Sequence, residues 1–210
     1  YVLTIKHAEI IAEWLRSKGI NVHAYSSQSE DREELEQKLL NNEIKALAAT
    51  VALGMGFDKP DIGFVIHYNR PASAVHYYQQ VGRAGRSVDK AYCVLMEGAE
   101  DQEITDYFIE EAYPPPDKIQ EVLELLENSD EGLKFTHILR KTNIRHKKLK
   151  QILKILEIEN PSPIAKYKSI YMRTPNEYHY PYQRVKAIRK KRLEEQEKMR
   201  EYMRTNDCLM

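Results

Sequence analysis

The first hundred residues alternate short apolar runs with stretches of helical spacing, and this alternation limits the possible folds more than any other feature. The apolar runs, which we expect to be strands, are residues 1–4, 22–25, 46–50, 64–68 and 91–96. Helices are expected between them, at residues 6–18, from Ser27 to about Leu40, and near residues 73–81. This order predicts a parallel sheet with helices on both faces. In such sheets, functional residues gather on loops at the carboxyl ends of the strands.

Several conspicuous residues of this region are expected to be structural. Ser27 and Glu30 have the spacing of a capping box at the start of the second helix. Trp14 lies on an apolar helical face and Cys93 lies within a strand, so we expect both in the core. We expect His67, at the end of a strand, to be packed or hydrogen-bonded rather than to act as a catalytic base.

The net charge of zero is a cancellation between three segments. Residues 1–98 have 11 basic and 12 acidic side chains, residues 99–132 have 1 and 12, and residues 133–210 have 20 and 8. A basic C-terminal third favours a polyanionic partner, most often a nucleic acid, although a solvated charged surface is the alternative.

The sequence contains no signal for a membrane or for secretion. No apolar run approaches the roughly 18 residues of a membrane helix, and Tyr1–Ile5 has neither the basic flank nor the cleavage site of a signal peptide. Two cysteines are too few for a disulfide framework. We therefore expect a soluble intracellular protein. Because the sequence starts without Met inside a predicted strand, we expect it to be part of a longer one.

Two loops carry unusual combinations of residues. The first, Thr50–Asp61, begins with the hydroxyl side chain of Thr50 at the end of a predicted strand. It continues with a Gly-x-Gly, a carboxylate and a proline turn. Glycines there permit close approach of a phosphate or sugar, although a lone Gly-x-Gly is more often an ordinary turn. The second, Gln79–Arg86, holds Arg83 and Arg86 among small residues. Two guanidinium groups at this spacing suit the charge that develops during phosphoryl transfer.

The residues of these two loops and their order along the chain resemble motifs V and VI of superfamily 2 helicases, and the residues are most similar to those of the RecQ family. The resemblance covers roughly residues 1–97 and implies the second RecA-like domain of an ATP-dependent 3′-to-5′ DNA helicase. It implies that Arg83 and Arg86 contact the γ-phosphate of ATP bound to the N-terminal RecA-like domain of the same chain. It further implies nucleotide contacts by Gln79, Gly56 and Asp58, the last of which could instead orient a motif VI arginine. DNA backbone contacts are implied for Thr50, through a free hydroxyl and N–H group, and for Thr4.

The sequence also departs from the family. It contains neither a Gly-x-x-x-x-Gly-Lys-Ser/Thr loop nor an Asp-Glu-x-His motif, so most contacts to ATP and Mg²⁺ would come from the N-terminal domain. The chain alone should not hydrolyse ATP. The alternative is a DNA-binding or docking module with a RecA-like fold and no motor activity.

The remaining sequence is expected to be mostly helical. Residues 99–116 are interpreted as an acidic connector in which Tyr113–Pro116 separates two helices, and Asp117 is expected to cap the second. Residues 117–175 are interpreted as a winged-helix-like domain, with Asn143 capping its recognition helix and a hairpin at residues 164–173. DNA contact is expected from Arg145, Lys147, Lys148, Lys150 and Lys168, with Lys154 also facing outward. The alternative use of this domain is protein docking.

The last segment, residues 176–210, is expected to be one charged helix, from residue 182 to residue 206, leading to a truncated zinc module. The RecQ resemblance makes Cys208 a tentative Zn²⁺ ligand whose companions lie outside the chain. Tyr178–Tyr182 is expected to be an aromatic packing cluster rather than a base-stacking surface. Single-stranded or forked DNA is the expected partner, in the bacterial cytoplasm or in a eukaryotic nucleus, with DNA repair and recombination as the implied processes.

Overall fold

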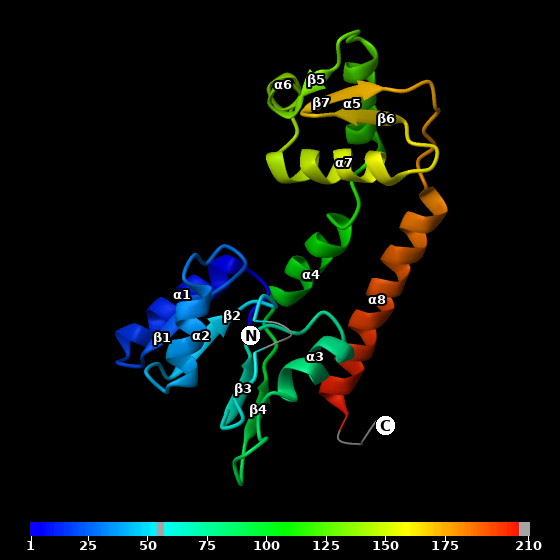
Figure 1. Ribbon diagram of the computed structural model, residues 1–210. Coiled ribbons are helices and arrows are strands. Elements are labelled where there is room, and N and C mark those ends of the chain that lie inside the picture. Colours follow the sequence, from blue (N-terminus) through cyan, green and yellow to red (C-terminus); the bar gives the residue numbers. More distant parts are fainter. Residues whose placement is uncertain (54–56, 206–210) are drawn as a thin grey trace. The chain divides into compact units, whose positions relative to one another are not determined.

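A computed structural model describes residues 1–53 and 57–205 and divides the chain into two compact units (Figure 1). Unit 1 comprises Tyr1–Ile109 together with the segment from Lys190 onward, and unit 2 comprises Glu110–Arg189. The division differs from the expected segments, because the helix after residue 100 and the second half of the long C-terminal helix belong to unit 1.

Unit 1 alternates helices and strands as expected. Its elements are α1 (Ile5–Ser17), β1 (Val22–Tyr25), α2 (Arg32–Leu40), β2 (Ala46–Ala49), β3 (Phe64–His67), α3 (Ala74–Val81), β4 (Tyr92–Leu95), α4 (Asp101–Glu110) and the C-terminal part of α8 (Tyr182–Arg204). β1 pairs in parallel with β2, and β3 pairs in parallel with β4. The predicted α/β class with parallel strands is confirmed.

Residues 1–2 link the two strand pairs of unit 1. The Val2 N–H group donates to the Ala49 carbonyl at 2.9 Å, and the Tyr68 N–H group donates to the Tyr1 carbonyl at 2.9 Å. The first residues therefore lie between β2 and β3, but they form no strand, so the strand expected at residues 1–4 is wrong.

Helices cover the strands of unit 1 unevenly. α1 packs on the face of β1 and β2 that holds Val22 and Ala48, and α2 packs on the opposite face through Leu35 and Leu39. In β3, only alternate residues such as Val65 are buried, and Ile66 remains exposed. The expectation of helices on both faces thus holds for β1 and β2 but is wrong for β3 within the described residues.

Three local expectations for unit 1 are also wrong. Trp14 is 59% exposed, because α1 buries the face of Ala8 and Ala12, and Trp14 points away from it. Cys93 is exposed because the described residues cover neither face of β4 there, and its neighbours Tyr92 and Val94 are exposed as well. The second helix begins at Arg32 with Asp31 as its N-cap and without a side-chain cap, so no capping box forms at Ser27.

Unit 2 is built from three helices and a small antiparallel sheet. Its elements are α5 (Pro116–Glu127), β5 (Leu133–Lys134), α6 (Phe135–Lys141), α7 (His146–Ile158), β6 (Ile164–Tyr167) and β7 (Ile170–Arg173). The strands pair in the order β5-β7-β6. The predicted hairpin is thus β6 and β7, and Leu149, Ile152, Leu153 and Leu156 of α7 are all buried in one core with residues of α5.

The helix starts in unit 2 differ from the prediction. α7 has Arg145 as its N-cap, and the main-chain N–H group of Asn143 donates instead to Glu121 at 3.2 Å. α5 starts at Pro116. Proline lacks an N–H group, but at this position the group would have no partner within the helix, so its absence does not destabilise the helix. Asp117 therefore lies in the first turn rather than at the cap.

The tyrosines that precede α8 form a packing cluster, as expected. The Tyr180 hydroxyl donates to the Pro114 carbonyl at 3.0 Å, and the Tyr180 ring meets the Tyr113 ring edge-on at 5.5 Å. Burial raises the pKa of the Tyr178 phenol, whose oxygen lies 3.4 Å from the Tyr113 oxygen. In the described part of the chain, no helix combines the length and hydropathy needed to cross a membrane.

Candidate functional site

The two loops singled out in the sequence are joined by backbone hydrogen bonds. The Gly85 N–H group donates to the Ile62 carbonyl at 3.0 Å, and the Ser87 N–H group donates to the Pro60 carbonyl at 2.9 Å. Gly85 has φ of +78° and its Cβ position would lie 3.3 Å from the Ala91 side chain, so a glycine is needed there. The loop that follows β2 and the loop that follows α3 therefore form one surface.

Arg86 and Asp58 meet on this surface. The Arg86 Nη1 atom lies 2.7 Å from Asp58 Oδ1, and Arg86 Nε donates to the Gly82 carbonyl at 3.1 Å. Both side chains are exposed, so the ion pair contributes little to stability. Its effect is to hold a guanidinium group in a fixed direction while leaving it open to solvent.

Arg83 is held more deeply. Its Nη1 atom donates to the Phe57 carbonyl at 2.7 Å, and its Nε atom is buried without a hydrogen-bond partner among the described residues. Its guanidinium lies beside the phenol of Tyr1, whose pKa is raised by burial and lowered in part by this positive charge. Arg83 thus retains donor capacity that an added acceptor could use.

α3 carries one exposed and one buried glutamine. Gln79, expected to contact the nucleotide, is exposed. Gln80 is buried, and its Oε1 atom lies 2.8 Å from Nε2 of the buried His67. Burial lowers the pKa of His67 to about 4, so the imidazole is neutral at physiological pH. His67 is packed and hydrogen-bonded as expected.

The two predicted threonine contacts have structural partners. The Thr4 hydroxyl caps α1 by accepting from the His7 N–H group at 3.1 Å. Thr50 was expected to have a free backbone N–H group, and this is wrong, because that group donates to the Tyr25 carbonyl at 3.0 Å. The Thr50 hydroxyl accepts from the Ala52 N–H group at 3.3 Å and retains its own proton as a donor, but Thr50 is buried, with 8% exposure.

Two predicted site residues, Gly56 and Cys208, lie outside the described residues. Within residues 1–53 and 57–205, no group of three or more His, Cys, Asp or Glu side chains is suited to bind a metal ion.

The basic residues of unit 2 do not all face solvent. Lys148 was expected to be free, but its amine lies 2.5 Å from the Glu111 carboxylate and also donates to the Glu111 carbonyl. Lys147, Lys150 and Lys154 are exposed and have no acidic partner in the described chain. Their spacing of three and four residues places them on one face of α7, which we call the lysine stripe. Arg145 and Lys168 are exposed at the start of α7 and in the β6–β7 turn, where Lys168 lies over the Tyr167 ring.

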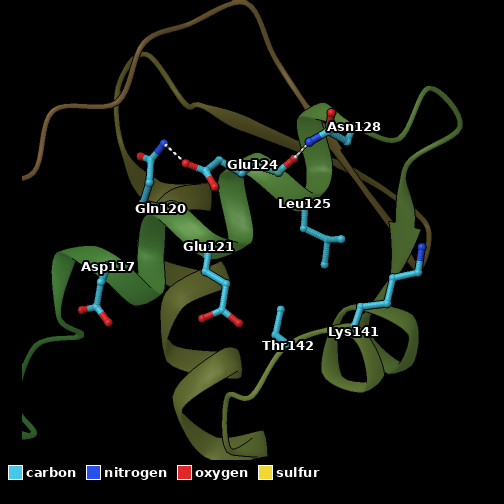
Figure 2. A pocket seen from close by; sticks show the side chains of 8 residues that line it. All are labelled: Asp117, Gln120, Glu121, Glu124, Leu125, Asn128, Lys141 and Thr142. Atoms are coloured by element: carbon cyan, nitrogen blue, oxygen red, sulfur yellow. Dashed lines mark hydrogen bonds between the residues drawn. The ribbon is translucent and has the colours of Figure 1, made fainter.

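A shallow pocket of about 470 Å³ lies between α5 and the end of α6 (Figure 2). Gln120 and Asn128 donate to the side chain and the carbonyl of Glu124, and Lys118 pairs with Glu121 at 2.9 Å. Several polar groups of this pocket thus have partners, and the Thr142 hydroxyl donates to the Ile138 carbonyl at 2.9 Å. Its lining residues are Asp117, Gln120, Glu121, Glu124, Leu125, Asn128, Lys141 and Thr142.

A buried polar cluster in unit 1 was not predicted. Arg70 is 2% exposed, and its guanidinium contacts Glu97, Gln102 at 3.0 Å, and Gln196 at 3.1 Å. The fully buried Asp101 accepts from the Asn69 amide at 2.7 Å and from the Arg70 N–H group at 2.9 Å. We call these six residues the Arg70 cluster. The one signal in the sequence is the position of Gln196, three residues before Met199 and seven before Met203, which places a polar residue on the same side of the helix as these two apolar ones.

Comparison with known proteins shows what the first part of the chain is similar to. Residues 1–88 match the family described as the helicase conserved C-terminal domain. The chain is 44% identical over 100 residues to ATP-dependent DNA helicase Q1 of Pongo abelii, a match that covers 47% of this chain and 15% of that protein. It is 36% identical over 121 residues to ATP-dependent DNA helicase RecQ of Synechocystis, covering 53% and 25% respectively.

Among solved structures, the E. coli DEAD-box protein SrmB aligns with 50% of this chain at a TM-score of 0.44 and 25% identity, over 64% of its own chain. The chain spans a quarter or less of the length of the two curated relatives. Residues 1–88 therefore match the helicase conserved C-terminal domain, and about half of the chain is similar in sequence to DNA helicases of the RecQ family.

Proposed function

We propose that this chain is part of a RecQ-like, ATP-dependent DNA helicase and supplies the arginines that act on the γ-phosphate. The observation that carries the proposal is the surface formed by the two joined loops, where Arg83 and Arg86 are held by Phe57 and Asp58. Two oriented guanidinium groups on one surface suit the charge that spreads over a transferred phosphoryl group.

The two arginines would have different roles. Arg86 is exposed, and its ion pair with Asp58 aims it while leaving donor atoms free, so it would reach the phosphate as an arginine finger. Arg83 is anchored deeper and would use its unpartnered Nε atom or a small shift toward the nucleotide. Gln79 and Asp58 would contact the nucleotide beside them. The phosphate-binding loop and the Mg²⁺ ligands would come from a segment outside this chain, an N-terminal RecA-like domain.

DNA would be held through phosphate contacts on both units. Thr50 supports this proposal in unit 1, because its hydroxyl retains a proton as a donor at the end of β2. The lysine stripe supports it in unit 2, together with Arg145 and Lys168, since ammonium groups without acidic partners bind a polyanion at little cost. Phosphate contacts of this kind position a strand without reading its sequence. The proposal includes 3′-to-5′ unwinding of single-stranded or forked substrates.

The test is ATP hydrolysis by the full-length protein that contains this chain. Arg83→Ala and Arg86→Ala should each lower kcat by about 10³-fold or more and leave the affinity for single-stranded DNA within about twofold. Arg32→Ala, which removes an exposed arginine at the start of α2, is the matched control and should change neither quantity. Full turnover in both variants would overturn the proposal and favour a DNA-binding module without motor activity.

A further inference from the structure

The second half of α8 is attached to the residues that lead into α3. Gln196 is 2% exposed, and its Nε2 atom donates to the Ala72 carbonyl at 2.6 Å and to the Pro71 carbonyl at 3.3 Å. Ala72 immediately precedes Ser73, whose hydroxyl caps α3 by accepting from the His76 N–H group at 3.3 Å. One amide of α8 therefore holds the main chain at the start of α3.

The same amide completes the hydrogen bonds of a buried charge. Gln196 Oε1 accepts from Arg70 Nε at 3.1 Å, while the other guanidinium donors go to Glu97 and Gln102. Because a buried guanidinium with a missing acceptor is costly, loss of Gln196 would disturb both Arg70 and the backbone after it. Arg200 of the next helical turn reaches Gln102 at 2.8 Å and extends the attachment.

A second contact between α8 and α3 lies further along both helices. The Tyr202 and Tyr77 rings are 5.3 Å apart at an angle of 55°. Met199, which is fully buried, lies between Gln196 and Tyr202 in the sequence and completes one continuous face of α8. Figure 1 shows the C-terminal part of α8 beside α3.

α3 is short, so these two contacts constrain most of it. The helix has eight residues from Ala74 to Val81, a length of about 12 Å. Arg83 follows its last residue by two positions and Arg86 by five. A tilt of α3 would therefore move both arginines.

We propose that Gln196 and Tyr202 of α8 are positioning residues that fix α3 and thereby set the direction of Arg83 and Arg86. The role of the arginines in this inference rests on the proposed function. The stabilisation of α3 by α8 does not depend on that function and can be tested separately. The functional cost follows from geometry, since displacement of a catalytic group by about 1 Å lowers turnover by up to 10²-fold.

The first experiment tests the brace itself. Amide hydrogen exchange is measured on this chain as wild type, as Gln196→Met, as Tyr202→Leu and as Gln183→Met. Gln183 is an exposed glutamine of the same helix and provides the matched control. We expect exchange at residues 74–81 to become at least tenfold faster in Gln196→Met and in Tyr202→Leu, while Gln183→Met matches wild type. Unchanged exchange of α3 in both test variants would overturn the proposal, whatever the arginines do.

The second experiment tests the consequence, in the full-length protein. Gln196→Met and Tyr202→Leu should lower kcat for ATP hydrolysis by about tenfold or more, with KM for ATP and DNA affinity within about twofold. Tyr202→Phe, which keeps the ring contact, should restore turnover. If α3 loosens while kcat is unchanged, the positioning role is wrong and the contact is only structural.

The two proposals fail in distinguishable ways. A protein in which Arg83→Ala has full activity would contradict the proposed function, while hydrogen exchange would still decide whether α8 braces α3. If Gln196→Met does not fold, the partly exposed Tyr202 provides the variant on which both measurements are made.

Discussion

At the scale of single residues, His67 is a group whose protonation near neutral pH depends on folding. It is 1% exposed, it lies between the Tyr1 ring at 5.4 Å and the Tyr77 ring at 5.1 Å, and its pKa is lowered to about 4 by burial. An unfolded histidine titrates near 6.5. The unfolded chain therefore binds a proton between pH 6.5 and 4 that the folded chain excludes.

This difference predicts how stability depends on pH. The contribution of His67 is fully present above about pH 6.5 and is lost as the pH falls toward 4, amounting to roughly 1–3 kcal/mol over that range. Urea unfolding at several pH values should show the slope in wild type and a smaller slope in His67→Gln. His179→Gln, which removes a histidine with 86% exposure, should keep the wild-type slope. Equal slopes in all three proteins would contradict the prediction.

Local spacing led to the prediction of Arg83 and Arg86 as site residues, because they lie close together among small residues. Their role stays a prediction, and the structure adds the ion pair between Arg86 and Asp58. Arg70 and Gln196 are 126 residues apart, and nothing in the sequence around either indicates the other. Buried polar pairs formed by tertiary structure carry no local periodicity, so sequence reasoning missed the cluster they form.

At the scale of elements, apolar spacing predicted the buried face of α7, whereas the buried face of α1 and two predicted helix caps were wrong. The apolar spacing of α7 correctly predicted its buried face, because one face of a helix must meet the core. The predicted caps at Ser27 and Asn143 were wrong. Ser27 lies outside α2, whose N-cap is Asp31, and the main-chain N–H group of Asn143 donates to Glu121. The exposed Trp14 shows the same limit, because the burial of α1 was set by its small residues.

The lysine stripe of α7 yields a prediction about salt. Changing Lys147, Lys150 and Lys154 together to glutamine should lower the slope of log affinity for DNA against log salt by about 2 to 3, as expected for three lost phosphate contacts. The control is the equal loss of charge at the exposed Lys6, Lys18 and Lys45 of unit 1. Titration of both triple variants with forked DNA at several salt concentrations measures the slopes. Equal slopes in both would identify the stripe as solvated surface or a docking face.

At the scale of the whole molecule, the chain consists of a discontinuous unit with a continuous one between its two parts. The prolines at residues 114–116 predicted a domain boundary near them, but nothing in the sequence predicted that residues 190–204 belong with the first unit. A truncation before residue 133, which the charge pattern suggests, would remove Gln196 from the buried cluster around Arg70. Deletion of residues 110–189 instead removes all of unit 2 and no residue of unit 1.

Unit 2 should fold by itself. Its buried hydrophobic cluster runs from Ile119 to Tyr171 and draws on no residue of unit 1. Residues 110–189 expressed alone should therefore show a cooperative thermal transition by circular dichroism. Leu149→Ala should destabilise this fragment by about 2–5 kcal/mol, whereas Lys150→Ala, one position along the same helix, should have little effect. A fragment without a cooperative transition would contradict the prediction.

The discontinuity of unit 1 has a consequence for protein synthesis. Gln196 leaves the ribosome 126 residues after Arg70, a delay of roughly 6–25 s at ~5–20 residues per second. During that time all of unit 2 is synthesised and can fold, while the Arg70 side chain still lacks its hydrogen-bond acceptor on Gln196. Unit 2 ends at Arg189, so its whole sequence is synthesised before the Arg70 side chain can form its hydrogen bond with Gln196 and unit 1 can be completed.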